Sequence, residues 1–172
     1  DMTPSVARAA AKYFMDEDMP IRLCYMGNTF INNSSYQGRL KENTQLGAEL
    51  IGDGSVDADA EVLSMVVDCL LKSGLSEFQI SVGHADFFRG LLEAAGTDEE
   101  EEQELKSLIS NKNFFGVEEF AETLKLDPGL TELFHMLGNP NVGKDDLQKA
   151  GELAVSYPRI LAAVRNLIEL QK

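Results

Sequence analysis

Apolar residues recur every three or four positions over several parts of the chain, a spacing that places them on one face of an α-helix. The first such stretch is 4–15, and Thr3 before it carries a side chain that can cap a helix. A second stretch covers 57–73. A third covers 85–95 and stops at Gly96, a residue type that commonly ends helices. These patterns predict three helices in the first part of the chain.

The segment between the first two of these helices has the pattern of β-strands. Residues 21–31 and 40–51 predict the two strands of a long antiparallel hairpin, and the polar run 32–35 predicts the turn or loop between them. Side chains alternate between the two faces of a strand, so Gln45 and Glu49 share one face with a glycine midway between them. A glycine in that place leaves room for a ligand on the sheet.

Beyond the hairpin the pattern becomes almost entirely helical. A short apolar run at 77–82 predicts a buried strand. Thr97 and Glu100 have the spacing of a capping box, and the acidic run beside them suits the positive end of a helix dipole, with a partner-binding role as the alternative. Helical periodicity predicts further helices at about 98–109, 116–124, 128–137, 144–155 and 158–171.

Taken together, these elements predict an α+β fold. Residues 1–95 would form an antiparallel sheet with flanking helices, and residues 96–172 would form an all-helical insertion subdomain. The content of 44% hydrophobic and 26% charged residues is that of an ordinary globular protein, so a sizeable core is expected.

The balance of charges narrows the classes of function. The chain has 29 acidic and 15 basic residues, a formal net charge of −14. A nucleic-acid surface needs clustered Lys and Arg to displace counterions, so we expect no nucleic-acid partner. No apolar stretch is long enough for a transmembrane helix and no signal-peptide pattern starts the chain, so we expect no membrane association and a cytoplasmic location.

Motifs for metals and cofactors are missing from the sequence. Cys24 and Cys69 each lie in an apolar run, which predicts buried free thiols. His84 and His135 are too few for a convincing zinc site. The sequence has no phosphate-binding glycine loop, dinucleotide fingerprint or nucleophile elbow. We therefore expect neither a metal nor a cofactor.

One concentration of polar side chains remains, on the predicted hairpin. It comprises Arg22, Gln45 and Glu49, with Tyr25 and Thr44 nearby. By residue type alone, these side chains form either a ligand site or a solvated surface.

The hairpin sequence resembles motif 2 of the histidyl-type class II aminoacyl-tRNA synthetases. RLCYMGNTF at 22–30, a polar loop and GRLKENTQLGAELIG at 38–52 follow the order of that motif, and DADAEVL at 57–63 is similar to the helix after it. The opening residues Asp1 to Pro4 resemble the end of a loop that contacts the amino acid in that family. The resemblance covers about residues 1–95. It implies a partial class II synthetase-like core and predicts that the chain is a fragment of a longer protein.

This resemblance implies roles for particular residues. Gln45 and Glu49 stand where the family holds the polar groups of bound histidine. Thr3 stands at a further amino-acid contact, and Asp1 takes the place of the usual glutamate at another. Glu42 is similar in position to a glutamate near the adenine of ATP. The resemblance therefore predicts a retained histidine-like pocket, with Glu42 in the adenylation site beside it.

A single position departs from the family's pattern. The motif 2 arginine follows the aromatic residue that ends the first strand; here that aromatic is Phe30, and the next residue is Ile31. In the family the arginine clamps the α-phosphate and the carboxylate, whereas isoleucine can neither donate a hydrogen bond nor carry charge. The resemblance thus implies a degenerate adenylation site at Ile31 and Glu42, no catalytic residue, and a protein that is not an enzyme.

This chain lacks that arginine but keeps Gln45 and Glu49. In this combination it resembles one branch of the family, the regulatory subunits of ATP phosphoribosyltransferase. The segment ISVGHADFFRGLLEAAG at 80–96 also resembles part of those proteins. This branch implies a subunit required with a short catalytic subunit for the first step of histidine biosynthesis, with self-association and with free histidine as a ligand for feedback sensing. Two alternatives stay open: a divergent histidyl-tRNA synthetase core that activates histidine with ATP, and a class II-like fold with an unrelated function.

Overall fold

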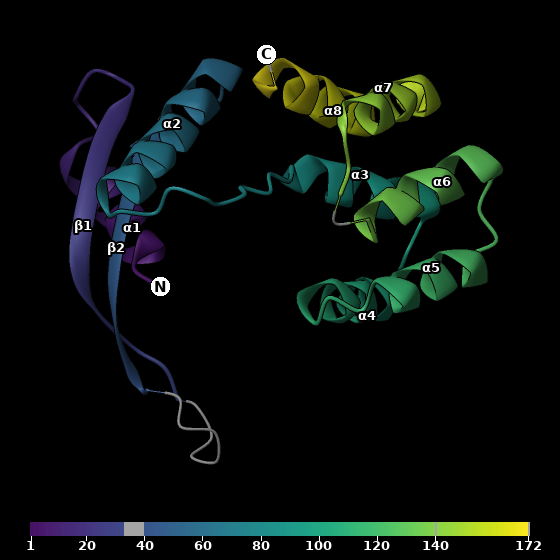
Figure 1. Cartoon of the computed structure of the whole chain (residues 1–172), viewed down its shortest axis with the longest axis horizontal. Helices are drawn as coiled ribbons and strands as arrows, with labels where there is room; N and C mark the ends of the chain where they lie inside the picture. The colour runs from purple at the N-terminus through teal and green to yellow at the C-terminus, as the bar shows by residue number, and fades with distance from the viewer. Residues whose placement is uncertain (33–39, 140, 172) are drawn as a thin grey trace. The chain divides into compact units, whose positions relative to one another are not determined.

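The computed structural model describes residues 1–32, 40–139 and 141–171, and it shows two compact units, Asp1–Ser76 and Glu77–Lys172 (Figure 1). Apart from Asn32, the turn predicted at 32–35 lies outside the described residues. Among the residues described, no helix has the length and apolar content needed to cross a bilayer.

The first unit is a long antiparallel β-hairpin accompanied by two helices (Figure 1). Its elements are α1 (Thr3–Tyr13), β1 (Ile21–Phe30), β2 (Glu42–Ile51) and α2 (Val56–Lys72). The strands pair from Ile21 opposite Ile51 to Phe30 opposite Glu42, so the predicted hairpin and both predicted helices are confirmed. Directly opposed residues share a face of the sheet, and this register therefore assigns each paired residue to one face.

An ion pair joins α2 to the hairpin. Nε and Nη2 of Arg22 donate to the two carboxylate oxygens of Glu61 at 2.5 and 2.7 Å, the bidentate geometry in which arginine and carboxylate pair best. These hydrogen bonds raise the pKa of Arg22 and lower the pKa of Glu61. The helix begins at Val56, one residue before the predicted start, and Ser55 caps it by accepting a hydrogen bond from the Ala58 N–H.

The second unit is a bundle of helices around an apolar core (Figure 1). Its elements are α3 (Ala85–Ala95), α4 (Glu99–Ser110), α5 (Phe114–Thr123), α6 (Pro128–Leu137), α7 (Lys144–Leu153), the 3-10 turn η2 (Ala154–Ser156) and α8 (Pro158–Leu170). Its largest fully buried side chains are Leu91, Leu105, Val117, Leu133, Phe134, Ile160 and Val164. In the described part of the first unit the buried apolar residues are only Ala10, Ile21 and Ala58. Apolar burial, the dominant stabilising term, is therefore concentrated in the helical unit.

Gly90 lets α3 and α8 approach each other closely. A Cβ atom at position 90 would lie 2.7 Å from Cγ1 and 3.1 Å from the backbone nitrogen of Ile160. Such distances are too short for a dense protein interior, so a larger residue would force the two helices apart. Packing thus explains a glycine in the middle of a helix, where its backbone freedom is otherwise unfavourable.

The strand predicted at 77–82 is wrong. These residues form no strand in the structure and are mostly exposed. A strand needs a neighbour to pair its backbone groups, and in the described parts of the chain the only sheet is the β1–β2 hairpin. The units divide after Ser76, so α3 packs with the helical unit, whereas the sequence placed the boundary near residue 95. The division into a synthetase-like core at 1–95 and an insertion at 96–172 rests on resemblance and stays a prediction.

Both cysteines are exposed, so the prediction that they are buried is wrong. An apolar neighbourhood in the sequence does not say which side of an element is covered. Cys24 shares a hairpin face with Met26, which is itself 75% exposed, and Cys69 lies on an outward part of α2.

The capping box at the start of α4 lies one residue later than predicted. Asp98 accepts from the N–H of Glu101 and Glu101 accepts from the N–H of Asp98, both at 2.9 Å. Thr97 cannot take this role because its hydroxyl donates to the carbonyl oxygen of Leu92. The acidic residues of this first turn therefore have a local structural role at the positive end of the helix dipole.

Candidate functional site

Gln45 and Glu49 lie on the same face of the hairpin, as the alternation along β2 predicts. Tyr25 of β1 stands opposite Gly47 of β2, midway between them, and so belongs to the same face. The backbone of Met2, just before α1, bonds to Gln45 and brings the start of that helix to this surface. We call this surface the Gln45 face and define it by Tyr25, Gln45, Gly47 and Glu49.

The side chain of Gln45 is held at both ends of its amide. The backbone N–H of Met2 donates to Oε1 at 3.1 Å, and Nε2 donates to the Tyr25 hydroxyl at 3.3 Å. A backbone N–H can only donate, so the atom that it meets must be the amide oxygen, and this fixes the orientation of the amide. Gln45 therefore presents a defined donor and acceptor to the Gln45 face.

Thr3 joins this cluster through its hydroxyl. That hydroxyl lies 3.4 Å from the Tyr25 hydroxyl, whereas α1 has Met2 as its N-cap residue and no side-chain cap. The prediction that Thr3 caps the helix is therefore wrong, because its side chain turns toward the hairpin. Tyr25 in this way connects Thr3 with Gln45, two of the residues predicted for the histidine-like pocket.

The carboxylate of Glu49 is the acidic group of the Gln45 face. The residue is half-buried, and within the parts of the chain that the structure describes no donor or cation pairs with its side chain. An ionised carboxylate accepts hydrogen bonds only, so Glu49 is available to a donor on a ligand. Asp1 is exposed and lies next to Met2, near the Gln45 end of the face.

The other predicted polar residues of the hairpin lie on its opposite face. Arg22 stands opposite Leu50, so it alternates with Gln45, and the prediction that it belongs to the same polar face is wrong. Thr44 also faces that way and donates to Asn28 at 3.0 Å, while Asn28 donates to Glu42 at 2.6 Å. The structure therefore does not bring Glu42 together with Gln45, and the adenine-site role of Glu42 stays a prediction.

Ile31 follows the end of β1. Its backbone N–H donates to the carbonyl oxygen of Lys41 at 2.8 Å, which continues the pairing of the two strands. The side chain is 50% exposed. Because the backbone holds this position, the side chain could change without disturbing the hairpin. Its place in a degenerate adenylation site stays a prediction.

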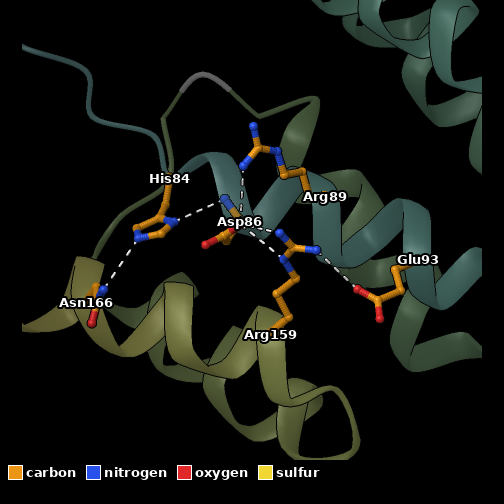
Figure 2. A network of polar contacts seen from close by, with 6 residues as sticks. All are labelled: His84, Asp86, Arg89, Glu93, Arg159 and Asn166. Atoms are coloured by element: carbon orange, nitrogen blue, oxygen red, sulfur yellow. Dashed lines mark hydrogen bonds and ion pairs between the residues drawn. The ribbon is translucent and has the colours of Figure 1, made fainter. Parts of the chain in front are cut away.

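A second group of polar contacts joins α3 to α8 (Figure 2). Arg159 donates to Asp86 from Nε at 3.0 Å and from Nη2 at 2.8 Å, and to Glu93 from Nη1 at 3.3 Å. His84 caps α3 by accepting from the N–H of Asp86 at 3.2 Å, and its other ring nitrogen lies 3.4 Å from the amide nitrogen of Asn166. Each of these groups has a partner within the packing of the two helices, so we assign the cluster a structural role.

The Asp86–Arg159 pair predicts a pH dependence of stability. Hydrogen bonding by Arg159 lowers the pKa of Asp86. The pair therefore stabilises the folded chain fully above about pH 4, the pKa of an unfolded aspartate, and this contribution is lost as the pH falls through the lowered folded-state pKa. Urea unfolding of wild type and Asp86→Asn between about pH 6 and pH 2 measures it. We expect the stability difference between the two proteins to shrink toward acid; a difference that stays constant would contradict the assignment.

Comparison with known proteins shows the family to which this fold belongs. The family model described as histidyl-tRNA synthetase matches residues 1–172. The chain belongs to the histidyl-tRNA synthetase family. The α+β arrangement, a two-stranded antiparallel sheet with flanking helices and a helical remainder, confirms the fold class predicted from the sequence.

Proteins named ATP phosphoribosyltransferase regulatory subunit are similar to the chain over almost its whole length. The one from Acetivibrio thermocellus is 38% identical over 97% of this chain and 40% of its own length. The one from Clostridium acetobutylicum is 34% identical over 100% of this chain and 43% of its own length, and the one from Desulforamulus reducens 37% over 99% and 42%. The chain spans about two fifths of the length of the curated relatives that it matches.

Proposed function

We propose that the chain is part of a non-catalytic regulatory subunit of ATP phosphoribosyltransferase. The observation that carries this proposal is the similarity, over almost the whole chain, to proteins of that name. The complete protein would bind a short catalytic subunit and be required with it for the first step of histidine biosynthesis. Self-association and a cytoplasmic location belong to the same proposal.

The ligand of this proposed subunit is free histidine, bound on the Gln45 face. In support, Tyr25 brings the Gln45 amide and the Thr3 hydroxyl together, and the half-buried Glu49 carboxylate lies on the same face. A free amino acid carries an ammonium donor and carboxylate acceptors, which match a surface that offers both kinds of group. Asp1 adds a second carboxylate near the Gln45 end, and histidine bound there would give feedback sensing.

A divergent histidyl-tRNA synthetase is the second candidate, because the matching family model bears that name. Two features count against it. Ile31 stands where the family's arginine is expected, and a net charge of −14 does not favour a tRNA surface. The two candidates differ in a measurable way, since only the synthetase would form an adenylate from histidine and ATP.

Reconstitution with a short catalytic subunit tests the regulatory role. We expect phosphoribosyl transfer to ATP to rise when the complete protein is added, by about 5- to 150-fold if the coupling is of ordinary size, and added histidine to reduce it. An active histidyl-tRNA synthetase is the matched control, since a member of the same family without the regulatory role should not activate. The proposal fails if the two proteins form no complex and the rate is unchanged.

A further inference from the structure

The ring of Tyr25 lies directly on Gly47, in the space between Gln45 and Glu49. A Cβ atom built on Gly47 would lie 2.3 Å from both Cζ and the hydroxyl oxygen of Tyr25. No side chain at position 47 could coexist with the ring in that place. Tyr25 and Gly47 lie directly opposite each other in the hairpin. The pairing of the two strands therefore fixes the backbone from which the ring extends. The space that a glycine leaves open on this face is therefore filled from the neighbouring strand.

The hydrogen bonds at the Tyr25 hydroxyl determine what this group can offer to a ligand. Nε2 of Gln45 must donate to it, because Oε1 is occupied by the N–H of Met2. The hydroxyl therefore keeps its own proton for an acceptor, either the Thr3 hydroxyl at 3.4 Å or a group on a ligand. Tyr25 thus sits between two groups assigned to the histidine-like pocket and sets how far apart they stand.

We infer that Tyr25, supported by Gly47, is a positioning and specificity-determining residue of the Gln45 face. Its ring forms the floor on which the ligand lies, and its hydroxyl holds Gln45 and Thr3 at the spacing that an amino acid requires. This inference rests on the proposed function, because it takes free histidine as the ligand. A flat side chain such as imidazole suits a floor made by an aromatic ring, since aromatic groups pack in offset-stacked or edge-to-face arrangements.

Two substitutions separate the ring from the hydroxyl. Tyr25→Phe keeps the floor and removes the hydroxyl, so histidine affinity should fall about two- to twelvefold, the range for one neutral hydrogen bond. Gly47→Ala leaves every polar group in place but displaces the ring, and affinity should fall about tenfold or more because the binding groups lose their alignment. The displaced atoms are the far end of a flexible side chain, so the hairpin itself is expected to fold.

The chain offers a matched control for each change. Tyr13→Phe removes a hydroxyl from a tyrosine that is 67% exposed, and Gly54→Ala adds a methyl group where no atom lies within 4 Å. Both should bind histidine as the wild type does. The measurements are isothermal titration of the complete protein with histidine, and the ¹⁹F resonance of 3-fluorotyrosine placed at position 25. Added histidine should shift that resonance, a change that a purely structural tyrosine would not show.

The binding and ¹⁹F measurements can either support or overturn the role of Tyr25. Weaker binding by Tyr25→Phe and Gly47→Ala, with unchanged controls and a shifted ¹⁹F resonance, supports the inference. The inference is overturned if all variants bind histidine equally, if histidine leaves the ¹⁹F resonance unchanged, or if the wild type does not bind histidine. Should Gly47→Ala fail to fold, Tyr25→Phe and the ¹⁹F signal still decide. Activation of the catalytic subunit without histidine tests the regulatory role alone, so failure of that role is distinguishable from failure at Tyr25.

Discussion

Replacing Phe134 by alanine is expected to lower the free energy of unfolding of the helical unit by about 3–5 kcal/mol. The side chain has no exposed surface and belongs to a core to which each of the helices α3 to α8 contributes. Its removal costs the transfer of an aromatic ring out of an apolar environment and leaves a cavity that a close-packed interior fills only in part. Most of the buried apolar residues in the described parts of the chain lie in this unit, so a loss at its core is expected to have a large effect.

Urea denaturation followed by far-ultraviolet circular dichroism measures this loss. The matched control is Phe115→Ala on α5, where the same atoms are removed from a side chain that is 69% exposed. Surface substitutions of that kind change stability by no more than about 0.5 kcal/mol. Equal losses for the two variants would show that Phe134 does not belong to a cooperative core.

The complete protein is expected to show no histidine-dependent exchange of pyrophosphate into ATP. This expectation rests on the resemblance to motif 2, which implies that Ile31, with neither charge nor a hydrogen-bond donor, stands where the family's arginine would hold the α-phosphate and carboxylate. Losing one preorganised donor to a developing negative charge typically costs about 10²–10³ in rate. The side chain of Ile31 is half-exposed, and its backbone N–H bonds to Lys41. An absence of pyrophosphate exchange is therefore not expected to reflect a disrupted hairpin.

Pyrophosphate exchange with labelled pyrophosphate, histidine and ATP is the measurement. An active histidyl-tRNA synthetase provides the positive control, and the same enzyme with its motif 2 arginine replaced by isoleucine provides the matched one. That variant should lose about 10²–10³ of its rate. Exchange by the wild-type protein at the rate of the active synthetase would exclude a non-catalytic regulatory subunit and favour a divergent histidyl-tRNA synthetase.

Local signals predicted the helices well, because caps and periodicity act within a few residues. The helix predicted at 85–95 has those bounds in the structure, and Gly96 ends it in the left-handed conformation that glycine adopts easily. The helix predicted at 128–137 likewise begins where expected, since Asp127 caps it and Pro128 fits its first position. The capping box of α4 was missed by one residue, because two overlapping sets of residues have the same spacing and only the folded contacts select one.

Predictions that required a distant partner were less successful. The apolar run at 77–82 has the composition of a strand, but a strand exists only where a neighbour pairs with it. Cys24 and Cys69 are in apolar sequence, yet their exposure depends on which side of the element another segment covers. Arg22 was assigned to the wrong face because the register of the hairpin, and not the composition of its strands, determines which residues share a face.

On the Gln45 face too, local sequence pattern predicted part of the arrangement, and contacts between distant residues decided the rest. Alternation along one strand was enough to place Gln45 and Glu49 together with a glycine between them, since side chains on a strand change face at every residue. The sequence by itself also determined the helices, the hairpin and the resemblance to the histidyl-type synthetases. Only the tertiary structure decided that Tyr25 fills the space over Gly47 and that Thr3 turns away from its helix to meet it. Those contacts join residues far apart in the chain, and their geometry follows from strand register and side-chain packing, which no local pattern encodes.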